Sequence, residues 1–248
     1  MRSFVFVVTL LHLLVSFSCK KKKSQDPESP NLSSSHFLLS DDNYTKLQVE
    51  IQYIEGYQPR TETLASLKSF MQQRMNKPDG IEFTTRVIPS GLRPNYSLED
   101  IRAIEKTYRT SNGSGKTISA YFLFLDKDYS ENAGSYSKVL GIHYGPTSIV
   151  VFENVIRQFS GGVTQPKLYD LETAVTEHEI GHMLGLTNHR SPMQTDHEDK
   201  DHPAHCNNTE CLMYYASETS DIVANLVGNP VPALDSNCLN DLRANGGK

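Results

Sequence analysis

The segment 170–186, DLETAVTEHEIGHMLGL, constrains the fold more than any other stretch of the chain. Its apolar residues recur at helical spacing, so one face of a helix is expected to pack against the protein core. His178 and His182 are four residues apart, so both imidazoles project from the same side of that helix, one turn apart. We expect the helix to begin with Asp170 as its N-cap and to end at Gly185.

The two histidines have the spacing of metal ligands, since both can bind one zinc ion at ~2.0–2.1 Å. Glu179 directly follows the first histidine, so its carboxylate can reach a water on the metal without binding the metal itself. Zinc lowers the pKa of such a water to about 7, and the carboxylate can take its proton during attack on a carbonyl. An amphipathic helix with two chance histidines is the competing interpretation, but six of the nine histidines lie between residues 178 and 205. The sequence therefore predicts a zinc centre with Glu179 as general base.

The chain upstream of this helix alternates between strand and helix patterns. The segment 117–125, TISAYFLFL, is dense enough in β-branched and aromatic residues to form a buried central strand. Further strands are expected over 47–54, 81–88, 139–144 and 148–152, and helices over 61–75 and from Ser97 to Tyr108. This order predicts an α/β (α+β) sandwich with a mainly parallel, mixed sheet.

Composition limits the class of protein. The chain has 248 residues, 38% hydrophobic and 21% charged, which supports one folded domain and excludes wholesale disorder. A net charge of -5 argues against a nucleic-acid binder, which would usually carry a basic excess. We expect a monomer that binds no nucleic acid.

Residues 1–19 are typical of an export signal, because Arg2 precedes an apolar stretch shorter than the ~20 residues of a membrane-spanning helix. The stretch ends in Ser16, Phe17, Ser18 and Cys19, which is similar to the lipobox of bacterial lipoproteins. In that family the signal is cut before the cysteine, which is then lipidated, although Ser16 stands where Leu is usual. The resemblance implies a membrane-anchored lipoprotein on the periplasmic face or the cell surface, with soluble secretion as the alternative.

The residues that follow the signal are expected to form a linker. Residues 20–43 are rich in Lys, Ser, Pro and Asp, a composition typical of a flexible tether. We therefore expect residues 44–248 to form the catalytic domain.

The segment 178–185, HEIGHMLG, resembles the motif of the metzincin clan of zinc peptidases. In that clan a third zinc histidine follows the glycine, and a methionine lies in a turn beneath the metal. Further along, the segment 205–213, HCNNTECLM, resembles the part of archaemetzincins that carries the third zinc histidine, two cysteines and the turn methionine. The stretch 170–215 is also similar to bacterial membrane-anchored metalloproteases of this group. The resemblance implies a zincin fold with a twisted mixed sheet, an HExxH helix and a Met-turn at Met213.

The third zinc ligand is the position at which the chain departs from the family. His205 is the first candidate, although 19 residues separate it from Gly185 where the archaemetzincin pattern has two. His197 is an alternative, because a neighbouring carboxylate could orient its imidazole. Asn188 and His189 lie nearer the position at which the metzincin motif has its third histidine, and they stay open as candidates.

The cysteines depart from the family pattern too. In archaemetzincins two cysteines at these positions and a downstream pair bind a second, structural zinc, whereas here only Cys238 follows Cys206 and Cys211. Four thiolates are therefore not available. A disulfide between Cys206 and Cys211 suits an exported protein better, with metal binding as the open alternative.

The resemblance implies a zinc-dependent endopeptidase that hydrolyses peptide bonds in proteins or peptides outside the cytoplasm. In metzincins an edge strand pairs with the substrate backbone, and the segment 140–145 is the candidate here, with His143 and Tyr144 able to stabilise an oxyanion. The competing class is a non-catalytic surface lipoprotein, a binding or adhesion module, whose structural zinc is closed by four protein ligands. Glu179 argues against that class, because a structural site has no use for a carboxylate at that position.

Overall fold

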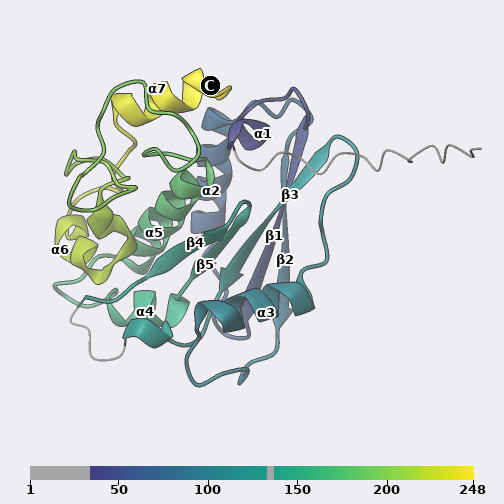
Figure 1. Cartoon of the computed structure of the whole chain (residues 1–248). Helices are drawn as coiled ribbons and strands as arrows, with labels where there is room; N and C mark the ends of the chain where they lie inside the picture. Colours follow the sequence, from purple (N-terminus) through teal and green to yellow (C-terminus); the bar gives the residue numbers. More distant parts are fainter. Residues whose placement is uncertain (1–33, 133–136) are drawn as a thin grey trace, which may run out of the picture. The chain divides into compact units, whose positions relative to one another are not determined.

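A five-stranded mixed sheet lies at the centre of the structure, a computed structural model that describes residues 34–132 and 137–248 (Figure 1). The strands are β1 (Lys46–Ile54), β2 (Ile81–Ile88), β3 (Thr117–Phe124), β4 (Gly141–Gly145) and β5 (Ser148–Val151). Their order is β2-β1-β3-β5-β4, with β4 antiparallel to β5 and the other neighbours parallel. The predicted mainly parallel, mixed sheet is confirmed, and β4 forms its edge beside helix α5.

Helices cover both faces of this sheet, with α2 and α5 on one side and α3 on the other (Figure 1). The α-helices are α1 (His36–Leu39), α2 (Thr61–Arg74), α3 (Leu98–Tyr108), α4 (Glu153–Gln158), α5 (Leu168–Met183), α6 (Val223–Leu226) and α7 (Ser236–Ala244). Short 3-10 turns are η1 (Ser130–Asn132), η2 (Tyr215–Glu218) and η3 (Ser220–Ile222). Among the described residues no helix has both the length and the apolar character to cross a bilayer.

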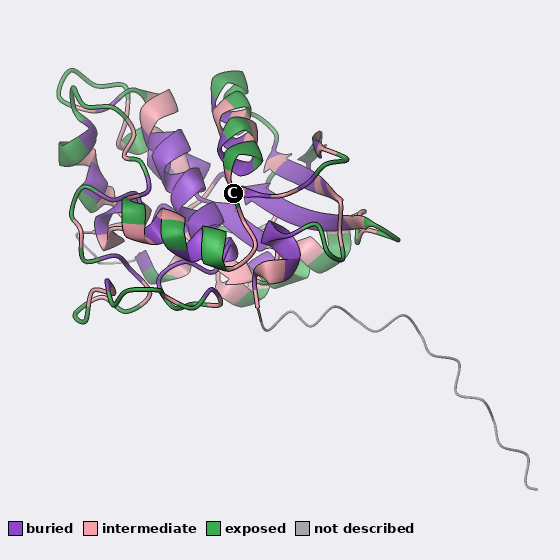
Figure 2. Ribbon diagram, turned by 90° about the horizontal axis from the view of Figure 1, so that it is seen from above, coloured by how far each residue is buried: buried purple, intermediate pink, exposed green. Residues whose placement is uncertain are grey.

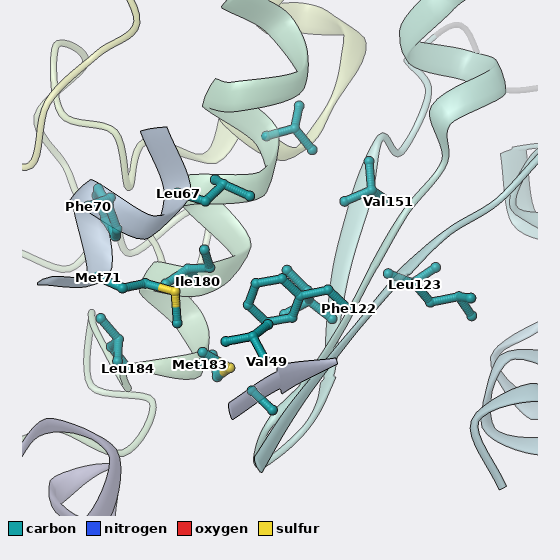
Figure 3. Close-up of a cluster of buried hydrophobic side chains, with 14 of the residues drawn as sticks. Val49, Leu67, Phe70, Met71, Phe122, Leu123, Val151, Ile180, Met183 and Leu184 are labelled. Atoms are coloured by element: carbon teal, nitrogen blue, oxygen red, sulfur yellow. The ribbon is translucent and has the colours of Figure 1, made fainter. Parts of the chain in front are cut away.

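The core lies between the sheet and the pair α2 and α5. Because side chains alternate along a strand, Val49 of β1 and Phe122 of β3 both face this pair of helices (Figure 3). The helices supply Leu67, Phe70, Met71, Ile180, Met183 and Leu184 (Figure 3). Figure 2 shows the consequence, with buried strands in the middle and exposed faces on the elements around them. Strand β3 is covered on both faces, which is why its sequence is apolar at nearly every position.

The folded domain begins before residue 44, so the predicted tether 20–43 is wrong at its C-terminal end. In α1 the side chains of Phe37, Leu38 and Leu39 are buried in the core. This apolar triplet gives the segment enough surface to dock, despite the polar residues around it. The predicted signal peptide, the lipidation site Cys19 and residues 20–33 lie outside the described residues.

Replacement of Leu38 tests whether this segment belongs to the domain. We expect Leu38→Ala to lower the free energy of unfolding by about 2–5 kcal/mol, because the side chain is fully buried. Val87→Ala is the matched control, since Val87 is 51% exposed, and its effect should stay within about 0.5 kcal/mol. Urea unfolding of the two variants measures both values, and an unchanged midpoint for Leu38→Ala would restore the tether interpretation.

Candidate metal centre

Helix α5 carries the predicted histidine pair and is buried at every position from Leu171 to Met183. It begins at Leu168, so Asp170 lies in the first turn and is not the N-cap, contrary to expectation. It ends as predicted, because Gly185 takes a left-handed φ of +84 and lets the chain turn back. A Cβ on Gly185 would come within 2.6 Å of the backbone nitrogen of Ser191, so this turn is closely packed as well.

His178 and His182 point at a common centre, with their Nε2 atoms 3.0 Å apart. The Nδ1 of His178 donates a hydrogen bond to the carbonyl of Leu212 at 2.7 Å, which leaves the Nε2 lone pair directed at that centre. Burial lowers the pKa of His178 to about 4 and that of His182 well below its ordinary value. Both imidazoles are therefore held in the neutral form that binds metals.

The structure brings His205 to the same centre. Its ring centroid lies 5.3 Å from that of His178 and 5.0 Å from that of His182. The side chain is buried, and neither ring nitrogen has a hydrogen-bond partner among the described residues. Burying an imidazole without hydrogen-bond partners costs free energy. A metal ion bound by the three histidines would remove this cost, so the arrangement suits a metal centre.

A fourth donor, Glu218 of η2, completes the cluster and was missed by the sequence reasoning. One ligand atom from each of the four residues lies within 4.8 Å of every other. The Oε2 of Glu218 is 3.5 Å from Nε2 of His205 and 3.9 Å from Nε2 of both His178 and His182. In the sequence Glu218 is an acidic residue five positions after Met213, and no periodicity or motif marks it as a ligand.

The structure does not bring the other candidates for the third ligand into this cluster. Asn188 lies in the turn after α5, where it adopts a positive φ of 64. His189 lies nearby, with its ring centroid 6.1 Å from that of His182, but it stacks edge-on against His143 at 5.3 Å. His197 lies in a separate cluster described below.

Met213 lies directly against the metal-site helix. A Cβ added to Gly181, between the two histidines of α5, would overlap the Met213 sulfur. The carbonyl of Met213 accepts a hydrogen bond from the backbone nitrogen of Cys206 at 2.8 Å, next to His205 in the chain. Met213 therefore packs against the part of α5 that lies between the two histidines.

Glu179 is fully buried on the side of α5 that faces strand β4. Neither carboxylate oxygen has a hydrogen-bond partner of normal geometry among the described residues. Burial, and then the negative charge of Glu218, raise the pKa of Glu179 well above its ordinary value, although the nearby amide of His143 partly opposes the rise. Gly141 makes room for the carboxylate, because a Cβ there would lie 2.9 Å from Oε1 of Glu179.

A second cluster of metal-binding residues lies beside the first. His197, Cys206, Asp235 and Cys238 offer ligand atoms within 4.8 Å of one another. The Sγ of Cys211 adjoins them, 3.7 Å from the Sγ of Cys238. Together the group contains three thiols, an imidazole and the carboxylate of Asp235, all of which are side chains that bind zinc in proteins.

The cysteines in this cluster are free thiols, so the structure contains no disulfide between Cys206 and Cys211. His197 Nδ1 lies 3.4 Å from the Cys206 sulfur, while its Nε2 lies 2.8 Å from a carboxylate oxygen of Asp241. This carboxylate–imidazole pair is the usual way of orienting a metal-binding histidine. An imidazole thus lies among these cysteines, a contact that the sequence spacing did not reveal.

The two clusters share no ligand, so removing a ligand from one cluster should release the ion of that cluster and leave the other ion bound. We expect the zinc-loaded chain to hold two ions, and His205→Ala and His197→Ala to retain one each, measured by native mass spectrometry. His202→Ala is the control and should keep both, because His202 is 43% exposed and belongs to neither cluster. Retention of both ions in His205→Ala would contradict the assignment of His205 to the first cluster.

Comparisons with known proteins agree with this fold. No protein-family model matches the chain, and no curated protein matches its sequence at a significant level. Among solved structures it is similar to archaemetzincin from Methanopyrus kandleri, with a TM-score of 0.52 and 17% identity, covering 81% of this chain and 96% of that one. A metalloproteinase-II from Bacteroides fragilis also matches, with a TM-score of 0.41 and 12% identity over 86% of this chain and 60% of that one. The chain therefore has a mixed α/β fold like that of archaemetzincin.

Proposed function

We propose that this protein is a zinc-dependent endopeptidase of metzincin type, in which His178, His182 and His205 hold the zinc. The observation that carries this proposal is Glu179, a fully buried carboxylate without a hydrogen-bond partner of normal geometry among the described residues. It lies between His178 and His182 in the chain. A structural metal site gives no reason to bury such a group. A general base for hydrolysis needs one at this position.

The three histidines are residues that bind zinc, and Glu179 is a residue that can transfer a proton. When bound, zinc acts as a Lewis acid that polarises a carbonyl and makes water acidic. The hydrogen bond from His178 to Leu212 keeps that imidazole in the tautomer that binds metal. Glu179 takes the proton from the attacking water and then passes it to the leaving amine. Its burial keeps this proton transfer away from bulk solvent.

The substrate is proposed to be a peptide that pairs with the edge strand β4. This strand is hydrogen-bonded to β5 on one side and ends the sheet on the other. Beside it lies a groove of about 370 Å³, which is lined by residues 142–146, by His189 and Arg190, and by Leu98 and Arg102 of α3. His143 is held neutral, since burial and then the charge of Arg190 lower its pKa to about 3. An extended peptide that pairs with β4 would pass Gly141, which is the position in the strand that lies against the Glu179 side chain.

The cluster around Cys206 is proposed to hold a second, structural zinc. His197, Cys206, Asp235 and Cys238 supply four donors close enough together for one ion, and the thiol of Cys211 adjoins them. Hydrogen bonds among the three thiols lower the pKa of Cys211 and raise the pKa of Cys206 and Cys238, so one negative charge is shared within this group.

Export and anchoring by a lipid on Cys19 stay proposals that rest on the sequence of residues 1–19. The second candidate function is a non-catalytic binding module with a structural metal. The observation in its favour is Glu218, because three histidines and a carboxylate provide the four donors of a closed site. The two candidates differ in whether Glu179 has a chemical role.

Replacement of Glu179 tests the proposed function directly. We expect Glu179→Gln to lower cleavage of a mixed peptide library by about 10²–10⁴-fold, because the general base is lost while the shape is kept. Its zinc content should equal that of the wild type. Glu62→Gln, at an exposed position on α2, is the control and should cleave normally. If the zinc-loaded wild type cuts no peptide, the binding-module candidate replaces the peptidase.

Gly141 offers a second test, because a Cβ at this position would press on the side chain of Glu179 and on Val175 beside it. Gly141→Ala should lower kcat by about 10²-fold, since the new Cβ would lie 2.8 Å from Cγ of Glu179 and displace it. Thr85→Ala, at an exposed position on strand β2, is the control and should keep the wild-type kcat. Equal activity in the two variants would show that the position of Glu179 does not matter.

A further inference from the structure

Glu218 has no basic residue to neutralise it in the part of the chain that the structure describes. The ion-pair contacts of its carboxylate are with His178, His182 and His205 alone. The Glu218 side chain is nevertheless only 32% exposed. A carboxylate in this position needs a positive charge, and the histidine centre is where a cation would supply it.

The backbone that carries the Glu218 side chain is fixed by two contacts with the chain before β4. The carbonyl of Glu218 accepts a hydrogen bond from the backbone nitrogen of Leu140 at 2.8 Å. The next residue, Thr219, pairs with Val139 in an antiparallel bridge. Residues 218 and 219 are therefore joined to the chain just before strand β4, and the side chain of Glu218 is presented to the histidines by a fixed segment.

The distances match a set of four ligands around one ion. Bonds of ~2.0–2.1 Å in a tetrahedron place neighbouring ligand atoms about 3.3 Å apart. The two histidine nitrogens of α5 are 3.0 Å apart, and the Glu218 oxygen is 3.5 Å from His205 and 3.9 Å from each of the others. One ligand atom from each of the four residues lies within 4.8 Å of all the others.

We propose that Glu218 is a fourth protein ligand of the metal held by His178, His182 and His205. This inference rests on the proposed zinc centre and deepens it. In the resting protein Glu218 fills the position that a catalytic zinc site keeps open for water or substrate. Glu218 must then leave the metal before a peptide carbonyl or a water can take that position.

Cobalt substitution tests the ligand set without reference to activity. We expect Co²⁺-loaded Glu218→Gln to show visible absorption bands that are shifted from those of the wild type, because one ligand is exchanged. Competition with a chelator should show that Glu218→Gln binds zinc at least about 10-fold more weakly than the wild type. Removing a group that only hydrogen-bonds to a metal ligand already costs about this much. Asp221→Asn is the matched control, an exposed carboxylate three residues away that should change neither value.

The backbone contact with Leu140 is kept in these variants, and circular dichroism of Glu218→Gln and Glu218→Ala shows whether each is folded. Unchanged cobalt bands and unchanged zinc affinity in both folded variants would overturn the proposal. Peptide cleavage is measured in parallel and should rise in Glu218→Gln, because the position on the metal is freed. A fall in cleavage with unchanged cobalt bands would make Glu218 a residue that positions substrate, which also overturns the proposal. If no form cleaves peptides, the peptidase proposal fails while the cobalt and affinity results still decide the role of Glu218.

Discussion

The hydrogen bond from His178 to the carbonyl of Leu212 is the contact on which the rest of the centre depends. It joins helix α5 to the segment that carries His205 and Met213, two parts of the chain that are 34 positions apart at this bond. It also selects the nitrogen of His178 that faces the centre. The close packing of Met213 against Gly181 holds the same two parts together on the apolar side. The segment that carries His205 and Met213 covers α5, and the polar side chains of His178 and His182 are therefore buried.

The two metal clusters are connected through consecutive residues. His205 lies in the first cluster and Cys206 in the second, so an ion in the second would restrain the backbone that positions the third histidine. His197 and Cys206 belong to the same long segment after Gly185, which has little regular secondary structure of its own. Metal ligands at both ends can replace the packing that a helix or strand would otherwise provide.

Most of the fold could be predicted from the sequence, because its strands and long helices depend on local periodicity. The segment 117–125 is one example, since an apolar run of that length fits a strand covered on both faces. Helix α1 could not be predicted, because Phe37, Leu38 and Leu39 form one short turn that is stabilised by distant parts of the chain.

Within the site, the histidine pair and Glu179 could be predicted because helical spacing alone places them. The third histidine stayed open among several candidates, since the turns after Gly185 decide which one reaches the centre. Glu218 and the contact of His197 with Cys206 depend wholly on how loops return to the helix, for which the sequence has no period. Such long-range contacts are visible only in three dimensions.

Anomalous diffraction at the zinc absorption edge tests most directly whether His178, His182 and His205 hold one metal ion. We predict a peak at ~2.0–2.1 Å from one ring nitrogen of each of these histidines in crystals of the zinc-loaded protein. A peak bound instead by His189 or Asn188, or no peak beside His178 and His182, would contradict the account.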